Sequence, residues 1–227
     1  MILKKSQNKI SSDYFREMAY YFGIAVQSDL TNIVSSKKPK NCFMDIEIFF
    51  LAATYNLKTS RIAEAFLCWL LKYGHLLSPS KIRRLIVSGE FFDSAVLGGI
   101  IVFLCENKIH AKQWKIVLPF CRKRKIVEPL LAGPFPRTPS SYFLKYRIAA
   151  PQFQLDIAKF LFPVTTIYKN CIELGNRSLF GSVVHADMAS YLKKHPRSTP
   201  YQIAKKTHHH KARIFAIYAD VRSHYLE

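Results

Sequence analysis

Helical spacing of apolar residues is the feature that most restricts the fold of this chain. Nearly every apolar segment repeats at intervals of three and four residues, whereas alternating, strand-like patterns are scarce. In residues 60–73 one helical face carries five apolar side chains: Ala63, Phe66, Leu67, Leu70 and Leu71. Because 49% of the 227 residues are hydrophobic, the chain can bury a substantial core. We therefore expect a mainly α-helical protein with a bundle-like N-terminal domain.

Capping residues indicate where several of these helices begin and end. Ser78 followed by Pro79 is typical of an N-cap and a first helical position, and Gly89 suits the end of the same helix. Asp93 predicts the start of another helix that continues to Glu106. Further helices are expected over residues 13–22, 45–55, 60–73, where Gly74 suits a left-handed cap, and about 111–120.

A proline-rich segment marks the best candidate domain boundary. EPLLAGPFPRTPSS contains four prolines and one glycine between residues 129 and 139. Helical patterns downstream are interrupted by Pro151 and Pro163. We expect a helical domain over residues 1–128, a linker with short helices over 129–175, and a C-terminal domain over 176–227.

The charge of the chain points to a polyanionic partner. Lysine and arginine number 34 against 15 acidic residues, which gives a formal charge of +19. Charge alone does not distinguish DNA from RNA or an acidic membrane face. The basic segments lack the large adjoining apolar face of an interfacial helix, so we expect no membrane contact. The densest basic run, CRKRK, contains four candidate phosphate contacts: Arg122, Lys123, Arg124 and Lys125.

The C-terminal segment has the pattern of a helix-turn-helix. A first helix is expected over residues 183–194, with Ala186, Ala189, Tyr191 and Leu192 available for packing. Thr199 and Pro200 begin a second helix, with Ile203 and Ala204 pointing inward, and a third starts near Lys211. In the third helix a buried stripe is formed by Ile214, Ile217, Tyr218 and Val221. Such an arrangement presents the first turn of its last helix to a DNA major groove.

Residues 176–225 read NRSLFGSVVHADMASYLKKHPRSTPYQIAKKTHHHKARIFAIYADVRSHY. This segment resembles the winged-helix transcriptional regulators of bacteria and archaea, whose signature begins with LFGS and continues into a pair of helices. The matching residues are Leu179, Phe180, Gly181, Ser182, Ala186, Asp187, Leu192, Ile203, Ala204, Thr207, Ile214 and Val221. The resemblance implies a DNA-binding regulator of transcription.

Two departures from that family pattern affect the expected fold. His208 stands in the turn where the family usually has a glycine with positive φ, a conformation that histidine tolerates at some cost. The sequence ends at Glu227, just after the third helix, so the two-stranded wing that the resemblance implies would be absent or truncated.

The helix-turn-helix hypothesis assigns roles to individual residues. Lys211, Ala212 and Phe215 would approach base edges, with three further residues nearby: His209, His210 and Arg213. Phosphate contacts are expected from Tyr201, Lys205, Lys206 and Arg222. The partner would be double-stranded DNA, and the N-terminal domain would serve dimerisation or binding of a protein partner.

The histidine triplet at residues 208–210 is interpreted as the turn and N-cap of the third helix. Three adjacent side chains diverge and do not all face one ion, so we expect no metal and no cofactor. The five cysteines, at 42, 68, 105, 121 and 171, lack any CxxC spacing and are interpreted as reduced thiols of the core.

Enzyme motifs are missing from the sequence. It has no Walker loop, no GxGxxG, no HExxH and no nucleophile elbow, and we do not expect an enzyme. Asp45 and Glu47 are interpreted as a solvated helix start, and Trp69 and Trp114 as core residues. Two alternatives stay open: a helical adaptor or antitoxin-like protein that binds an acidic protein, and an RNA-binding helical protein.

The sequence also predicts a cytoplasmic location. The opening residues, MILKKSQNKI, contain no apolar signal segment. The most hydrophobic stretch, residues 95–105, is about half as long as a bilayer-spanning helix.

Overall fold

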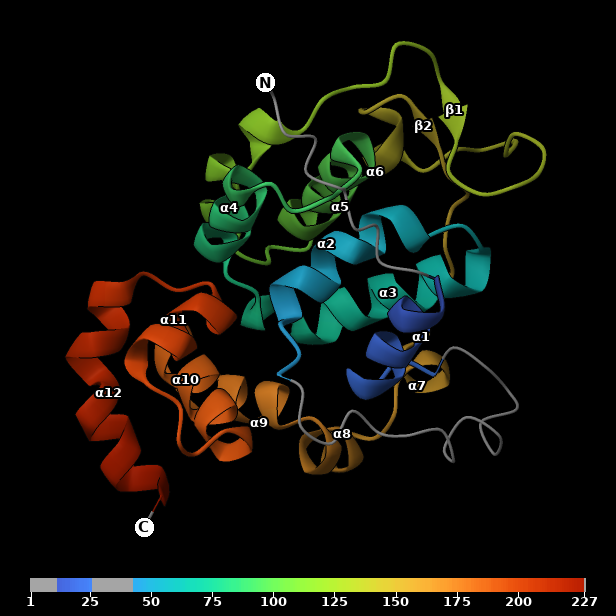
Figure 1. Cartoon of the computed structure of the whole chain (residues 1–227). Coiled ribbons are helices and arrows are strands. Elements are labelled where there is room, and N and C mark those ends of the chain that lie inside the picture. The colour runs from blue at the N-terminus through green and yellow to red at the C-terminus, as the bar shows by residue number, and fades with distance from the viewer. Residues whose placement is uncertain (1–11, 26–42, 227) are drawn as a thin grey trace.

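The computed structural model describes residues 12–25 and 43–226, and this part of the chain is mainly helical, as predicted (Figure 1). Five helices build its N-terminal half: α1 (Ser12–Tyr21), α2 (Ile46–Asn56), α3 (Ser60–Tyr73), α4 (Pro79–Ser88) and α5 (Ser94–Glu106). Helix α2 lies between α1 on one side and α4 and α5 on the other. The opening residues and Cys42 lie outside the described ranges.

The capping predictions for α4 and α5 are confirmed. The Ser78 side chain accepts a hydrogen bond from the first turn of α4, and Gly89 ends that helix with φ of 95°. Asp93 caps α5 in the same way. The prediction for Gly74 is wrong, because its φ is −59° and the chain continues there as the 3-10 helix η1 (Gly74–Leu76).

Residues 111–120 do not form the expected α-helix. They contain two short 3-10 helices, η2 (Gln113–Ile116) and η3 (Leu118–Phe120). Pro119 has no backbone N–H to donate, which prevents a continuous α-helix through this point. Trp114 is nevertheless fully buried, as predicted, and its Nε1 donates to the Ile109 carbonyl at 3.0 Å.

The segment expected to be a linker is part of the main core. It forms β1 (Glu128–Pro129), α6 (Ser141–Leu144), β2 (Ile148–Ala149), α7 (Ile157–Phe160) and α8 (Val164–Asn170). Strands β1 and β2 pair in parallel, with Glu128 opposite Ile148. Eight of its side chains are buried in the larger hydrophobic core: Phe143, Ile148, Ala150, Phe160, Leu161, Ile167, Cys171 and Leu174.

Two glycines in α5 allow this segment to pack so closely. A Cβ atom at Gly98 would lie 2.3 Å from the ring of Tyr146, and one at Gly99 would lie 2.3 Å from the ring of Phe143. Both aromatic rings therefore rest directly on the helix backbone of α5, a contact that larger side chains exclude.

The described residues form two hydrophobic cores. The larger extends from Phe15 to Leu174 and belongs to what we call the body, residues 12–25 and 43–174. The smaller belongs to the C-terminal unit, which consists of α10 (Val183–Lys194), α11 (Pro200–Thr207) and α12 (Lys211–Leu226). Helix α9 (Ile172–Leu179) connects the two and packs against α10.

Candidate nucleic-acid interface

The local sequence of α11 accounts for the start of that helix. The Thr199 hydroxyl accepts from the Gln202 backbone N–H at 3.3 Å, and the Gln202 side chain accepts from the Thr199 N–H at 2.8 Å. This reciprocal capping box, with Pro200 in the first turn, satisfies backbone donors that a helix N-terminus leaves unpaired. The predicted start of α11 is confirmed.

The turn between α11 and α12 consists of the three histidines. His208 adopts the left-handed conformation, with φ of 57° and ψ of 29°, as the sequence predicted. The His210 carbonyl accepts from the N–H groups of Arg213 and Ile214, which begins α12 at Lys211. Histidine is one of the non-glycine residues that tolerate positive φ, so the turn forms without glycine.

The buried stripe of α12 holds the C-terminal unit together. Ile214 and Val221 are buried against Ile203 and Ala204 of α11, while Ile217 and Tyr218 pack at the edge of this core. The predicted stripe is therefore confirmed. The inward residues of α10 that the sequence predicted are buried as well: Ala186, Ala189, Tyr191 and Leu192.

Nine of the ten predicted DNA-binding residues lie on the exposed side of α11 and α12. They are Tyr201, Lys205, Lys206, His210, Lys211, Ala212, Arg213, Phe215 and Arg222. Phe215 is 58% exposed, although it is a large apolar side chain that would ordinarily be buried. The Lys211 Nζ lies 4.3 Å from the centre of the Tyr201 ring, a cation–π contact that joins the starts of α11 and α12.

His209 is the exception, and its predicted contact with DNA is wrong. The side chain is 7% exposed, and its Nε2 lies 2.8 Å from Asp187 Oδ2 in α10. Arg84 of α4 places Nη2 3.3 Å from the other ring nitrogen. Because an arginine only donates hydrogen bonds, Nδ1 accepts and Nε2 carries the proton that Asp187 accepts. His209 therefore ties the turn to the body.

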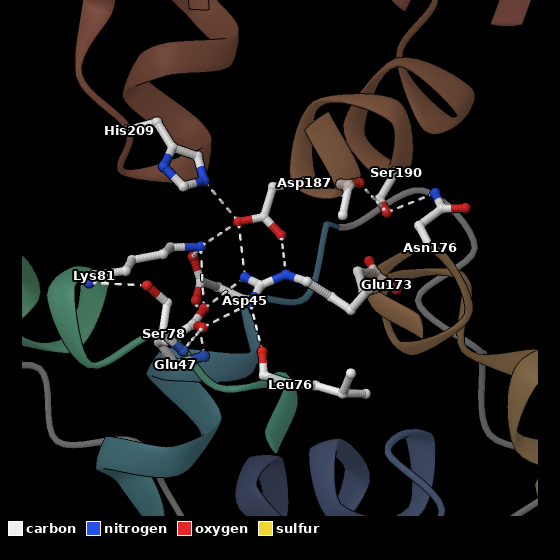
Figure 2. A network of polar contacts seen from close by, with 12 residues as sticks. Asp45, Glu47, Leu76, Ser78, Lys81, Glu173, Asn176, Asp187, Ser190 and His209 are labelled. Atoms are coloured by element: carbon white, nitrogen blue, oxygen red, sulfur yellow. Dashed lines mark hydrogen bonds and ion pairs between the residues drawn. The ribbon is translucent and has the colours of Figure 1, made fainter. Parts of the chain in front are cut away.

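Beneath the turn lies a buried cluster of charged groups, which we call the ionic cluster: Asp45, Glu47, Lys81, Arg177, Asp187 and His209 (Figure 2). Arg177 of α9 is its hub. Its guanidinium makes two bonds to Glu47, both 2.9 Å, and two to Asp187, 2.7 and 2.9 Å. It also donates to the Leu76 carbonyl at 2.8 Å. One side chain thus joins α2, η1 and α10.

Lys81 is the second cation of the ionic cluster. Its ammonium lies 2.6 Å from Asp187 Oδ2, 2.7 Å from Asp45 Oδ2 and 3.2 Å from Glu47 Oε2. Lys81 and Arg177 are buried, so neither charge is solvated by water. Buried charges are stable only where partners replace their hydration. In this cluster the carboxylates are the partners of the two cations, and the cations are the partners of the carboxylates.

The earlier interpretation of Asp45 and Glu47 as a solvated helix start is wrong. Asp45 is the N-cap of α2, where its Oδ1 accepts from two backbone N–H groups. Its other oxygen faces Lys81. Two residues within a helix that are two positions apart point in different directions. Asp45 is a cap residue and is not helical, so its carboxylate and that of Glu47 both reach Lys81.

Burial and neighbouring charges move the pKa values of the ionic cluster in different directions. Burial raises the pKa of Asp45 to about 7, despite the attraction of Lys81. Burial alone would also raise the pKa of Glu47, but Arg177 and then Lys81 lower it to about 2. The same two cations hold the pKa of Asp187 well below its usual range against the effect of burial. Burial lowers the pKa of His209, which favours the neutral ring.

These shifts favour a protonated Asp45 and a neutral His209. With Asp45 protonated and His209 neutral, Glu47 and Asp187 carry two negative charges against the two positive charges of Lys81 and Arg177. Ionisation of Asp45 adds a third buried negative charge. Because the pKa of Asp45 is higher in the folded chain than its ordinary 3.8, this ionisation opposes folding as the pH rises from about 4 through about 7.

We expect Asp45→Asn to remove this pH dependence. The stability of the natural protein relative to this variant should fall as the pH rises from about 4 to about 7, then stay level. Urea denaturation of both proteins at a series of pH values measures the difference in stability. The titration of His208 and His209 contributes to both proteins and therefore cancels in this difference. A constant difference across the range would contradict the shifted pKa of Asp45.

Polar contacts also fix α9 to its neighbours. Glu173 forms a 2.7 Å ion pair with Lys194 at the end of α10 and accepts from the Tyr21 hydroxyl at 2.5 Å. Asn176 donates to the Ser190 hydroxyl at 2.9 Å. The orientation of α10 is therefore determined by α1 and α9 together with the ionic cluster.

The basic run at residues 121–125 lies apart from α11 and α12. Strand β1, which begins three residues after the run ends, is on the far side of the molecule from α12 (Figure 1). Arg122, Lys123 and Lys125 are exposed, whereas Arg124 is paired with Glu128 at 2.6 Å and with Asp93 at 3.0 Å. The expected phosphate contact from Arg124 is therefore corrected to a structural ion pair.

The described part of the chain contains no group of three or more His, Cys, Asp or Glu side chains arranged to hold a metal ion. Cys68 and Cys171 are buried free thiols, whereas Cys105 and Cys121 are partly exposed. None of the helices in residues 12–25 and 43–226 has both the length and the apolar character needed to cross a membrane.

Comparisons with models of protein families, with curated proteins and with solved structures find no match to this chain.

Proposed function

We propose that this protein is a sequence-specific DNA-binding regulator that uses α11 and α12 as a helix-turn-helix. The observation that carries the proposal is the exposure of the N-terminal side chains of α12, while its opposite face is buried. Lys211, Ala212 and Phe215 project from the surface where base edges would be read. Lys205, Lys206 and Arg222 flank them and suit phosphates.

The net charge of the chain supports a nucleic-acid partner. Residues 193–224 contain eight lysines and arginines and one acidic residue, Asp220. A surface with this excess attracts the phosphate backbone and releases its condensed counterions on binding. The body fits a role in dimerisation or in binding a protein partner.

The proposal is tested by comparing base-reading and phosphate-binding residues. Duplex DNA selected from genomic fragments is compared with random duplex at about 50 mM and about 200 mM salt. We expect Lys211→Ala to lose preference for the selected sequence, by about 1–3 kcal/mol. Replacing both Lys205 and Lys206 with alanine should weaken binding to all sequences alike and lower the salt slope by about 2.

Arg61→Ala supplies the control, because Arg61 is an exposed cation of α3 in the body. Its affinity and salt slope should equal those of the natural protein. Equal losses on every sequence for Lys211→Ala and for the Lys205 and Lys206 variant would contradict the assignment of base reading to α12. Binding that does not respond to salt would favour an adaptor that binds protein, and tighter binding to RNA would reassign the ligand.

A further inference from the structure

Helix α4 of the body lies directly against the turn of the C-terminal unit. Lys81 and Arg84 are three residues apart and therefore share one face of α4. Lys81 is bonded to Asp187 of α10 at 2.6 Å, and Arg84 donates to His209 of the turn at 3.3 Å. This face of α4 thus meets the C-terminal unit just before α12 begins at Lys211.

Arg84 is a cation without an ion-pair partner at this junction. Within the described residues, no carboxylate lies within 4.0 Å of Arg84 or of Arg213 in the first turn of α12. The Nε of Arg84 is buried and has no hydrogen-bond partner. Among residues 12–25 and 43–226, Arg84 has one polar side-chain contact, with His209, which is neutral when its Nδ1 accepts.

Arg213 lies in the first turn of α12, four residues after His209, the residue that Arg84 contacts at 3.3 Å. Burial and then the positive charge of Arg213 lower the pKa of Arg84, and these effects outweigh the attraction of Glu47, Asp187 and Asp45. Those carboxylates are already paired with Lys81 and Arg177. Two like charges held near one another, each with unused donors, are unfavourable until an anion binds between them.

We propose that Arg84 of α4 and Arg213 of α12 together bind one phosphate of the DNA backbone, so that the body contributes directly to the DNA-binding surface. The inference rests on the proposed function and adds a second group of phosphate contacts to the DNA-binding surface. Lys205 and Lys206 would hold the backbone on the side of α11, and Arg84 and Arg213 on the side of α4. Guanidinium groups suit this role because their planar donors match phosphate oxygens.

A double-mutant cycle on random-sequence duplex DNA tests the shared phosphate. We expect Arg84→Gln and Arg213→Gln each to weaken binding about tenfold, on all sequences, and to lower the salt slope by about 1. The double variant should bind about as weakly as either single variant, because loss of one arginine already releases the phosphate.

Arg83→Gln is the matched control. Arg83 is exposed, carries the same charge on the same helix, and lies about 100° around α4 from Arg84. Its effect should not exceed about twofold at about 0.2 M salt, because screening weakens distant exposed charges. Thermal unfolding followed by circular dichroism checks each variant. If Arg84→Gln does not fold, Arg84→Lys replaces it in the cycle, where it should still show non-additivity with Arg213→Gln.

The outcomes separate this inference from the proposed function. If the natural protein binds duplex DNA with a strong salt dependence but Arg84→Gln behaves like Arg83→Gln, the phosphate site is wrong and the proposed function stands. Additive losses in the double variant would also overturn the site, because they show two independent contacts. If the natural protein does not bind duplex DNA, the proposed function itself fails.

Discussion

Replacing Arg177 with methionine is expected to lower the free energy of unfolding by about 3–5 kcal/mol. The change removes the four bonds to Glu47 and Asp187 and leaves both carboxylates buried with one cation, Lys81. Methionine matches the length of the arginine stem, so the loss comes from the uncompensated charge rather than from a large cavity. Urea denaturation followed by circular dichroism measures the change.

Two further variants define the cause of that loss. Arg197→Met removes an exposed arginine from the loop before α11 and should change the stability by less than about 0.5 kcal/mol. Arg177→Lys keeps the charge but cannot bond both carboxylates in pairs, so its loss should be intermediate. A change below about 1 kcal/mol for Arg177→Met would show that the cluster does not depend on its hub.

Replacing Trp69 with alanine is expected to cost about 3–5 kcal/mol. This fully buried side chain of α3 lies among four aromatic rings, with centre-to-centre distances from 5.4 to 6.3 Å: Phe22, Phe49, Phe66 and Tyr73. Its Nε1 also donates to the Phe22 carbonyl at 2.9 Å, which joins α3 to the end of α1. The variant loses packing and leaves that carbonyl unpaired.

The same denaturation experiment includes two comparisons for Trp69. Trp69→Phe keeps most of the packing and should lose less, since chiefly the hydrogen bond to Phe22 disappears. Phe215→Ala removes an aromatic ring of α12 that is 58% exposed and should be nearly neutral for stability. If Trp69→Ala were as mild as Phe215→Ala, the aromatic cluster would not be the centre of the body's core.

Local signals in the sequence predicted several elements to within a residue. Thr199 with Pro200, Ser78 with Pro79, and Asp93 mark helix starts that the structure confirms. These signals work because a cap acts on backbone groups only two or three residues away. The positive φ of His208 was expected because the family that this segment resembles usually has a glycine at this place in the turn.

The ionic cluster could not be predicted in this way. Arg177 and Glu47 are 130 residues apart, and nothing in the sequence near either residue identifies its partner. An acidic residue near a helix start is usually solvated, which led to the wrong interpretation of Asp45. A weak signal was present in Asp187, which belongs to the regulator signature but sits among the inward residues of α10.

The prolines of residues 129–175 predict a linker, whereas the structure packs this segment into the main core. Proline interrupts the interior of a helix or of a central strand, but it does not prevent burial of the side chains around it. The packing of this segment depends on the glycine pair in α5, because the rings of Tyr146 and Phe143 pack against Gly98 and Gly99. Which aromatic residue packs against which glycine depends on tertiary structure that helical periodicity does not contain.

The long sequence separations in the ionic cluster have a consequence for synthesis on the ribosome. Asp45, Glu47 and Lys81 emerge long before Asp187 and Arg177, which follow Lys81 and Glu47 by 106 and 130 residues. A nascent body therefore holds two acidic groups and one ammonium whose partners have not yet been translated, and water must keep them hydrated until then. Arg177, Asp187 and finally His209 dehydrate this site, so the junction is complete only after translation has passed the turn before α12.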